Sequence, residues 1–181
     1  YASPAVADLD GDGAPEVIGA AYTIFVLDGA TGALEWSVKS GHDRDESGVS
    51  NVGRTWPGVV VADVDGDGAL EIVTAHSGGY ISVYTRDGYF ESGWPKRPST
   101  SELRGLAVTD LDDDGTLEIV VSAAVGSRVN TWVYEHTGVL RAGWPQLSDD
   151  SGYAAGIYND NVAAGDLDGD GAPDVALGAP G

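Results

Sequence analysis

The sequence DLDGDGAPE, residues 8–16, decides the interpretation of this chain, because close copies of it return three more times. The copies read DVDGDGALE at 63–71, DLDDDGTLE at 110–118 and DLDGDGAPD at 166–174. Each has a carboxylate at its positions 1, 3, 5 and 9 and a glycine at position 6, and a strand-like apolar run follows it. Successive copies begin 55, 47 and 56 residues apart (63−8, 110−63 and 166−110). Such a period is typical of a solenoid or a propeller.

The acidic nonapeptide also predicts a calcium site. Oxygen ligands at alternate positions of a tight loop suit Ca²⁺, and the backbone carbonyl at position 7 offers one more oxygen. Glycine at position 6 allows the positive φ of a sharp turn. Four carboxylates exceed what Mg²⁺ usually takes from protein, so we expect about four Ca²⁺ ions. The predicted ligands are Asp8, Asp10, Asp12, Ala14 and Glu16; Asp63, Asp65, Asp67, Ala69 and Glu71; Asp110, Asp112, Asp114, Thr116 and Glu118; and Asp166, Asp168, Asp170, Ala172 and Asp174.

An EF-hand shares the opening of this pattern but needs a bidentate glutamate at position 12, between two helices. Position 12 is occupied here by Gly19, Thr74, Val121 and Leu177, and the flanking runs are β-rich. The sequence therefore excludes an EF-hand.

Four short strands are predicted around each loop. In the first unit they fall at 4–7, 16–21, 24–27 and 34–38, separated by Gly/Asp turns and without helical periodicity. In the second and third units the fourth strand is predicted at 89–94 and 139–144, and the third unit also has predicted strands at 106–109 and 129–135. A four-stranded antiparallel unit that recurs about every 50 residues is the blade of a β-propeller, so the fold class is all-β.

We expect one repeat domain over 1–181, with blades at about 1–40, 56–100 and 101–147 and a partial blade at 157–181. Polar, turn-rich segments at 41–55 and 148–156 are predicted to be inserted loops. Closed propellers have about 4–8 blades, and this chain has about three and a half. It also contains no methionine, even at position 1. We therefore expect a piece of a larger propeller, whose open blade edges associate with the rest of a longer chain or with a partner.

The charge of the chain excludes one class of partner. The formal net charge is −20, and 16 of the 29 acidic residues (four in each of four loops) are predicted calcium ligands. Four bound Ca²⁺ ions would bring the charge to −12 (−20 + 8), which still disfavours a nucleic-acid partner. No apolar run reaches the roughly 18 residues of a membrane span. Because millimolar calcium is an extracellular condition, a secreted or cell-surface location is expected.

The remaining chemistry-bearing residues favour structural roles. Trp36, Trp94 and Trp144 occupy equivalent ends of the units, which predicts packing between blades, with sugar stacking as the alternative. The three histidines, His42, His76 and His136, are too scattered for a zinc site or a catalytic pair. No nucleophile motif or phosphate-binding glycine loop is present.

With these residues in view, the chain resembles the FG-GAP/VCBS-type repeats of integrin α subunits and of many secreted bacterial proteins. The resemblance covers nearly the whole chain. The Leu177-Gly178-Ala179-Pro180 segment matches the GAP element, whereas the phenylalanine-glycine element is not evident. Gly93-Trp94-Pro95 and Gly143-Trp144-Pro145 look more like the bacterial branch. The resemblance implies that each acidic loop joins the first two strands of a blade and binds calcium.

Three functions are compatible with this sequence. The first is a non-catalytic, calcium-stabilised extracellular propeller for structure, adhesion or protein interaction. The second is a carbohydrate-binding propeller, because lectins of this repeat class exist. The third is the scaffold of a polysaccharide lyase, since rhamnogalacturonan lyases resemble this repeat in their acidic loops. The nine Lys and Arg residues form no cluster along the sequence for proton abstraction, so we expect no enzyme.

Overall fold

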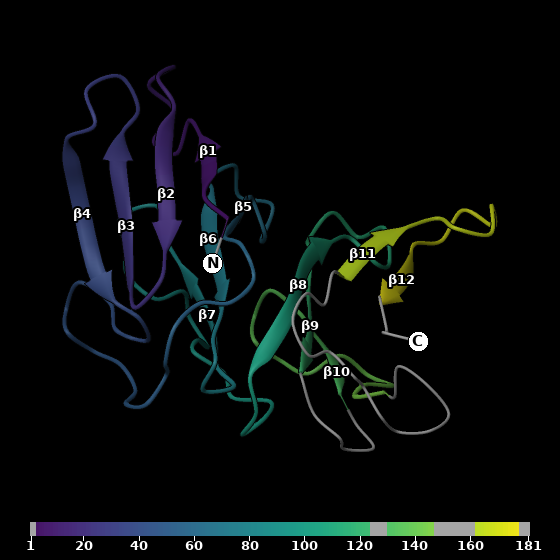
Figure 1. The fold of residues 1–181 in the computed structure, drawn as a ribbon. Coiled ribbons are helices and arrows are strands. Elements are labelled where there is room, and N and C mark those ends of the chain that lie inside the picture. The colour runs from purple at the N-terminus through teal and green to yellow at the C-terminus, as the bar shows by residue number, and fades with distance from the viewer. Residues whose placement is uncertain (1–2, 124–129, 147–161, 178–181) are drawn as a thin grey trace.

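The structure is a computed structural model, and it describes residues 3–123, 130–146 and 162–177. Within these residues the fold is all-β, and the strands form four separate antiparallel sheets (Figure 1). No helix long and apolar enough to cross a membrane is found in the described part of the chain. The strands are β1 (Ala5–Ala7), β2 (Glu16–Ala20), β3 (Thr23–Asp28), β4 (Leu34–Lys39), β5 (Val60–Ala62), β6 (Glu71–Ala75), β7 (Ile81–Tyr84), β8 (Leu103–Thr109), β9 (Glu118–Ala123), β10 (Thr131–Tyr134), β11 (Val162–Gly165) and β12 (Asp174–Leu177).

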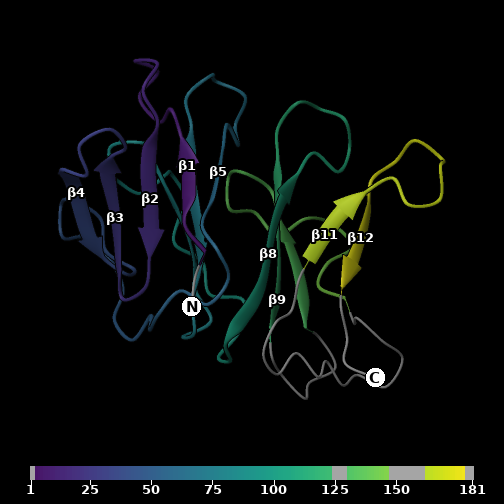
Figure 2. The same ribbon diagram turned by 45° about the horizontal axis from the view of Figure 1, so that its top comes forward.

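Each sheet is one unit of the sequence repeat, and its strands pair in chain order. The sheets are β1-β2-β3-β4, β5-β6-β7, β8-β9-β10 and β11-β12. The first strands of successive sheets are neighbours in space, β1 beside β5, β5 beside β8 and β8 beside β11. The four acidic loops consequently project from the same side of the molecule, the top in Figure 2. This arrangement confirms the all-β propeller-blade prediction.

The fourth strand of the second and third blades differs from the prediction. Instead of continuous strands at 89–94 and 139–144, the structure has two isolated bridges in each blade. In the second blade Phe90 pairs with Tyr84 and Lys96 pairs with Ile81. Between them the N–H of Trp94 donates to Glu91 O, and Gly93 has a φ of 91°. A tight turn therefore interrupts the strand, and Pro95 has no N–H with which to rejoin the ladder at once.

The other strand predictions hold within a few residues. The strand predicted at 129–135 is shorter, Thr131–Tyr134, and the one predicted at 106–109 begins earlier, at Leu103. The loop predicted at 148–156 lies outside the described residues.

The core lies between blades rather than within one. Every residue of β6 is buried. Alternate side chains of a strand point to opposite faces of its sheet, and both faces of β6 are covered by neighbouring blades. Ile72 packs towards the first blade in a cluster with Ile18 and Val26. Val73 packs on the other side, in a cluster with Ile119 of the third blade. Burying side chains of this size contributes roughly 1.5–3 kcal/mol each, so neighbouring blades stabilise one another.

Two of the repeated tryptophans connect adjacent blades by hydrogen bonds. Trp36 Nε1 donates to Arg86 O of the second blade (3.1 Å), and Trp94 Nε1 donates to His136 O of the third blade (2.8 Å). Both indoles are 7% exposed. The predicted inter-blade role is confirmed for these two residues. Trp144, at the equivalent place in the third blade, is only half-buried.

Candidate metal centres

Each acidic loop joins the first two strands of its blade and follows the same local path. In the second loop both oxygens of Asp63 accept backbone hydrogen bonds, Oδ1 from Gly66 (2.8 Å) and Oδ2 from Gly68 (2.9 Å). Gly68 has a φ of 92°, a left-handed conformation that glycine adopts at little steric cost. This confirms the predicted need for glycine at position 6, which Gly13, Gly115 and Gly171 meet in the other loops.

The acidic residue at position 9 begins the second strand and turns its carboxylate back over the loop. Glu71 Oε2 accepts a hydrogen bond from Val64 N (2.8 Å), and the residue is only 3% exposed. One oxygen of each such carboxylate is held in this way. The equivalent contacts join Glu16 to Leu9 N (2.7 Å), Glu118 to Leu111 N (2.6 Å) and Asp174 to Leu167 N (3.0 Å).

Three carboxylates converge in every loop. One oxygen from each of positions 1, 3 and 9 lies within 4.8 Å of the other two. Calcium–oxygen bonds are about 2.3–2.6 Å long, so two ligands of one ion can be at most about 5 Å apart, and these oxygens satisfy that limit. The four groups are Asp8, Asp10 and Glu16; Asp63, Asp65 and Glu71; Asp110, Asp112 and Glu118; and Asp166, Asp168 and Asp174.

A buried oxygen without a hydrogen bond gives an independent indication of a cation. Glu118 is fully buried, and its Oε1 accepts no hydrogen bond. Its nearest cation is Arg141 Nη1, 3.6 Å away and beyond hydrogen-bond distance, so a metal ion would give this buried oxygen a closer partner. The donor set of this loop therefore fits a hard divalent cation, with Asp110, Asp112 and Glu118 as the residues that would hold it.

The carboxylate at position 5 is not part of these groups. Asp67 Oδ1 accepts a hydrogen bond from Ala69 N (2.7 Å), which stabilises the turn that follows it. The same contact forms in the other three loops. The ligand role of the position 5 residues (Asp12, Asp67, Asp114 and Asp170) and of the position 7 carbonyls (Ala14, Ala69, Thr116 and Ala172) stays a prediction.

The third loop departs from the others at position 4. Asp113 stands where Gly11, Gly66 and Gly169 stand elsewhere, and it has a φ of 60°. Aspartate tolerates the left-handed region better than most residues, but with a steric cost that glycine avoids. Asp113 is exposed, and its N–H donates to Asp110 Oδ1 (2.7 Å). Its extra charge therefore lies on the solvent side of the loop.

Burial raises the pKa of two of the position 9 glutamates, Glu71 and Glu118. Desolvation raises the pKa of Glu71 to about 7, and the nearby charge of Asp65 adds to the effect, whereas the hydrogen bond from Val64 opposes it. Desolvation likewise raises the pKa of Glu118 to about 7. A divalent cation beside these groups would favour their ionised form. The second loop is therefore electrostatically unfavourable without a counter-ion, which favours cation binding there.

A guanidinium group that the motif did not predict, that of Arg141, contacts the third loop. Arg141 Nη2 lies 3.0 Å from Asp112 Oδ2, and its Nη1 lies 3.6 Å from Glu118 Oε1. The same guanidinium pairs with Glu135, at 3.3 Å. Nothing in the nonapeptide signals this contact, because Arg141 is 23 residues beyond Glu118 in the sequence (141−118). Only the antiparallel return of the blade brings it to the loop.

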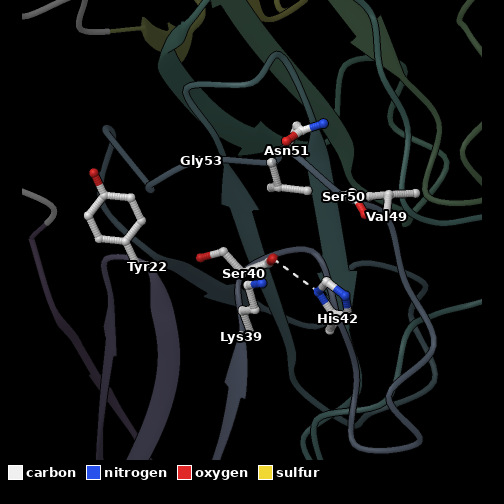
Figure 3. Close-up of a pocket in the computed structure, with 9 residues that line it drawn as sticks. Tyr22, Lys39, Ser40, His42, Val49, Ser50, Asn51 and Gly53 are labelled. Carbon is white, nitrogen blue, oxygen red and sulfur yellow. Dashed lines mark hydrogen bonds between the residues drawn. The ribbon is translucent and has the colours of Figure 1, made fainter.

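A pocket is formed where the connection 41–55 passes the end of the first blade (Figure 3). Its volume is about 410 Å³, and its lining is mostly polar, with Lys39, Ser40, His42 and Asn51 among the residues. Tyr22 lies on one side of it and is 65% exposed. His42 Nδ1 is 3.4 Å from Ser40 O. The sequence marked this segment as an insertion but did not predict the pocket.

The other histidines and tryptophans have structural surroundings. His76 is fully buried, and its ring nitrogens contact the hydroxyls of Thr55 (3.3 Å) and Thr74 (2.9 Å). Burial lowers its pKa to about 3, so the ring is neutral. Trp56 lies between two guanidinium groups, those of Arg54 and Arg104, 3.5 and 4.0 Å from its ring centroid.

Fold and loops together define a class: antiparallel blades, each with an acidic loop between its first two strands. Comparison with family models identifies the class. The FG-GAP-like repeat matches residues 63–121 and again 110–177, which together span 115 of the 181 residues (177−63+1). The chain therefore belongs to the FG-GAP-like repeat family.

Solved structures share the fold at low sequence identity. The V. cholerae biofilm matrix protein Bap1 is 21% identical with a TM-score of 0.50, and the match covers 99% of this chain and 35% of that one. The computationally designed Ika4 protein is 19% identical with a TM-score of 0.51, and the match covers 98% and 92%. This chain thus spans about a third of the Bap1 chain. No match was found among curated proteins.

Proposed function

We propose that this chain is part of an extracellular β-propeller that calcium stabilises and that serves as a non-catalytic structural or adhesion module. The observation that carries the proposal is the convergence of three carboxylates in each of four loops, all on one side of the molecule. Membership of the FG-GAP-like repeat family supports it. The shared fold with a biofilm matrix protein is consistent with such a role.

The electrostatics of the loops explain why the ion would be structural. The three position 9 glutamates, Glu16, Glu71 and Glu118, are buried in their blades, so calcium would offset charges that otherwise oppose folding. Extracellular calcium modules bind with a Kd of about 0.1–1 mM. At free calcium about ten times the Kd, each site would add roughly 1.4 kcal/mol of stability, and four independent sites about 6 kcal/mol. That is comparable to the entire net stability of a domain, about 5–15 kcal/mol.

Thermal unfolding with and without chelator tests the proposal. For a domain of this length, about 6 kcal/mol corresponds to a rise in Tm of roughly 12–24 °C between EDTA and millimolar calcium. The matched control replaces Asp63, Asp110 and their equivalents Asp8 and Asp166 by Asn, which should leave little difference between the two conditions. Equal Tm values for the unaltered chain in EDTA and calcium would refute the proposal.

Carbohydrate binding is the second candidate, and the pocket beside Tyr22 favours it. A polar cavity of about 410 Å³ with an exposed aromatic side chain at its edge suits a sugar, which stacks on the ring and hydrogen-bonds to the lining. We propose glycan binding there as an activity additional to the structural role. Nothing among the described residues favours the third candidate, a polysaccharide-lyase scaffold, over these two.

A glycan array followed by titration of the best binder tests this second proposal. Tyr22→Ala should weaken binding at least tenfold, whereas Tyr89→Ala, which removes an exposed tyrosine of the second blade, should leave it unchanged. If no glycan binds, or if both variants bind as the unaltered chain does, glycan binding at this pocket is wrong.

Association is proposed to use the edges of the blades. The last described sheet has two strands, β11 and β12, and unpaired strand edges favour pairing with another chain segment. The partner would be the rest of a longer chain or a protein or glycan at the cell surface.

A further inference from the structure

One position near the start of the fourth strand lies close to the acidic loop, and the residue at this position is acidic in two blades and basic in the third. In each of the first three blades the end of the third strand pairs with the start of the fourth: Leu27 with Leu34, Tyr84 with Phe90 and Tyr134 with Leu140. The next residues are Glu35, Glu91 and Arg141. Backbone hydrogen bonds confirm that Glu91 and Arg141 are equivalent: Glu91 N donates to Val83 O and Arg141 N donates to Val133 O, both at 2.9 Å.

The arginine of the third blade reaches two of the carboxylates that would hold the metal. Its guanidinium contacts Asp112 at 3.0 Å and the otherwise unbonded Oε1 of Glu118 at 3.6 Å. The arginine side chain is 20% exposed and the glutamate side chain 0%, so solvent screens this pair less than an exposed one. Glu135 holds the guanidinium from its other side, at 3.3 Å.

We propose that Arg141 is a built-in counter-ion that makes the third site the weakest of the first three calcium sites. The inference rests on the proposed calcium binding and adds to it a graded order of affinities. In the metal-free protein the guanidinium partly neutralises the carboxylates of the third loop and holds Asp112 and Glu118 together. The first and second loops have a glutamate at that place and depend on the metal.

The size of the effect follows from the distances. A cation bound to Asp112 would be about 5 Å from the guanidinium, the sum of the 3.0 Å contact and one calcium–oxygen bond. Repulsion between charges of +1 and +2 at about that separation corresponds to roughly a tenfold loss of affinity, even at the dielectric constant of water. The calcium midpoint of the third loop should therefore lie roughly tenfold above that of the second.

Hydrogen exchange of the whole chain, measured by mass spectrometry over a calcium titration, resolves the loops separately. In the unaltered chain, peptides that cover 63–71 should become protected at roughly tenfold lower free calcium than peptides that cover 110–118. Arg141→Gln should lower the midpoint of 110–118 by about tenfold and leave that of 63–71 unchanged. In EDTA the same variant should exchange faster at 110–118, because the counter-ion is lost.

Two further variants complete the test. Arg97→Gln makes the same charge change on a residue that contacts Gly78 and Tyr80, away from the acidic loops, and should alter no midpoint. Glu91→Arg should transfer the counter-ion to the second blade and raise the midpoint of 63–71.

The outcomes separate the two proposals. If no loop gains protection in calcium, calcium binding itself is refuted, and the graded affinities with it. If 63–71 responds while 110–118 has the same midpoint with and without Arg141, only the counter-ion role is overturned.

Discussion

Replacing Glu71 by glutamine should stabilise the metal-free protein and weaken its response to calcium. Burial raises the pKa of Glu71 from 4.5 to about 7, so ionising this side chain costs more in the folded state than in the unfolded one. The shift of about 2.5 pH units corresponds to roughly 3 kcal/mol at 1.36 kcal/mol per unit. At pH 8, above both pKa values, the folded protein bears this whole cost. A neutral glutamine does not, and its amide oxygen can still accept the hydrogen bond from Val64 N.

Urea unfolding in EDTA and in calcium at pH 8 measures both effects. In EDTA, Glu71→Gln should raise the free energy of unfolding by about 2–3 kcal/mol. In calcium at ten times the Kd, the variant should gain about 1.4 kcal/mol less than the unaltered chain, because one site is lost. Glu46→Gln, the same change at an exposed position of the connection 41–55, should do neither. A variant of Glu71 that is less stable in EDTA would refute the reasoning.

Three other predictions follow from the same structure. In EDTA the free energy of unfolding should fall as the pH rises from about 5 to 8, because the raised pKa values of Glu71 and Glu118 mean that the folded state holds protons more tightly. In saturating calcium, which keeps both carboxylates ionised, this fall should disappear, and urea melts at three pH values would compare the two slopes. Asp113→Gly should raise the stability by about 1 kcal/mol in thermal melts by relieving a φ of 60°, and an unchanged Tm would contradict this. Trp94→Phe should lower the free energy of unfolding by about 2 kcal/mol, because it removes the hydrogen bond to His136 O and leaves that carbonyl without its partner, and a loss below 0.5 kcal/mol would contradict the inter-blade role.

The loops and most strands could be predicted because their signals are local. The nonapeptide determines its own conformation: position 1 accepts the backbone hydrogen bonds, and position 6 supplies the left-handed turn, as Asp63 and Gly68 show. The strands beside it have apolar runs such as 71–75, buried on both faces, that read as strands without any knowledge of the neighbouring blades. Four copies of one local pattern then indicate the blade.

The features that escaped prediction depend on contacts between distant segments. Arg141 reaches the third loop only because the blade folds back on itself, so no motif spacing could reveal it. The interruption of the fourth strand is set by the turn at Gly93, where an added Cβ would lie 2.3 Å from Thr137 O of the next blade. The pocket at Tyr22 likewise depends on the path that the connection 41–55 takes. The polar composition of this segment does not determine that path.

The second and third loops are linked to each other as well as to their own blades by backbone hydrogen bonds. Glu71 Oε2 holds Val64 N, and Val64 O in turn accepts a hydrogen bond from Leu117 N of the next loop (2.9 Å). Leu117 is followed directly by Glu118, whose carboxylate holds Leu111 N. A continuous set of hydrogen bonds thus joins one group of carboxylates to the next. A cation at the second loop would fix Glu71 and, through Val64, the carbonyl that Leu117 N contacts, so without it the start of β9 should be held less firmly.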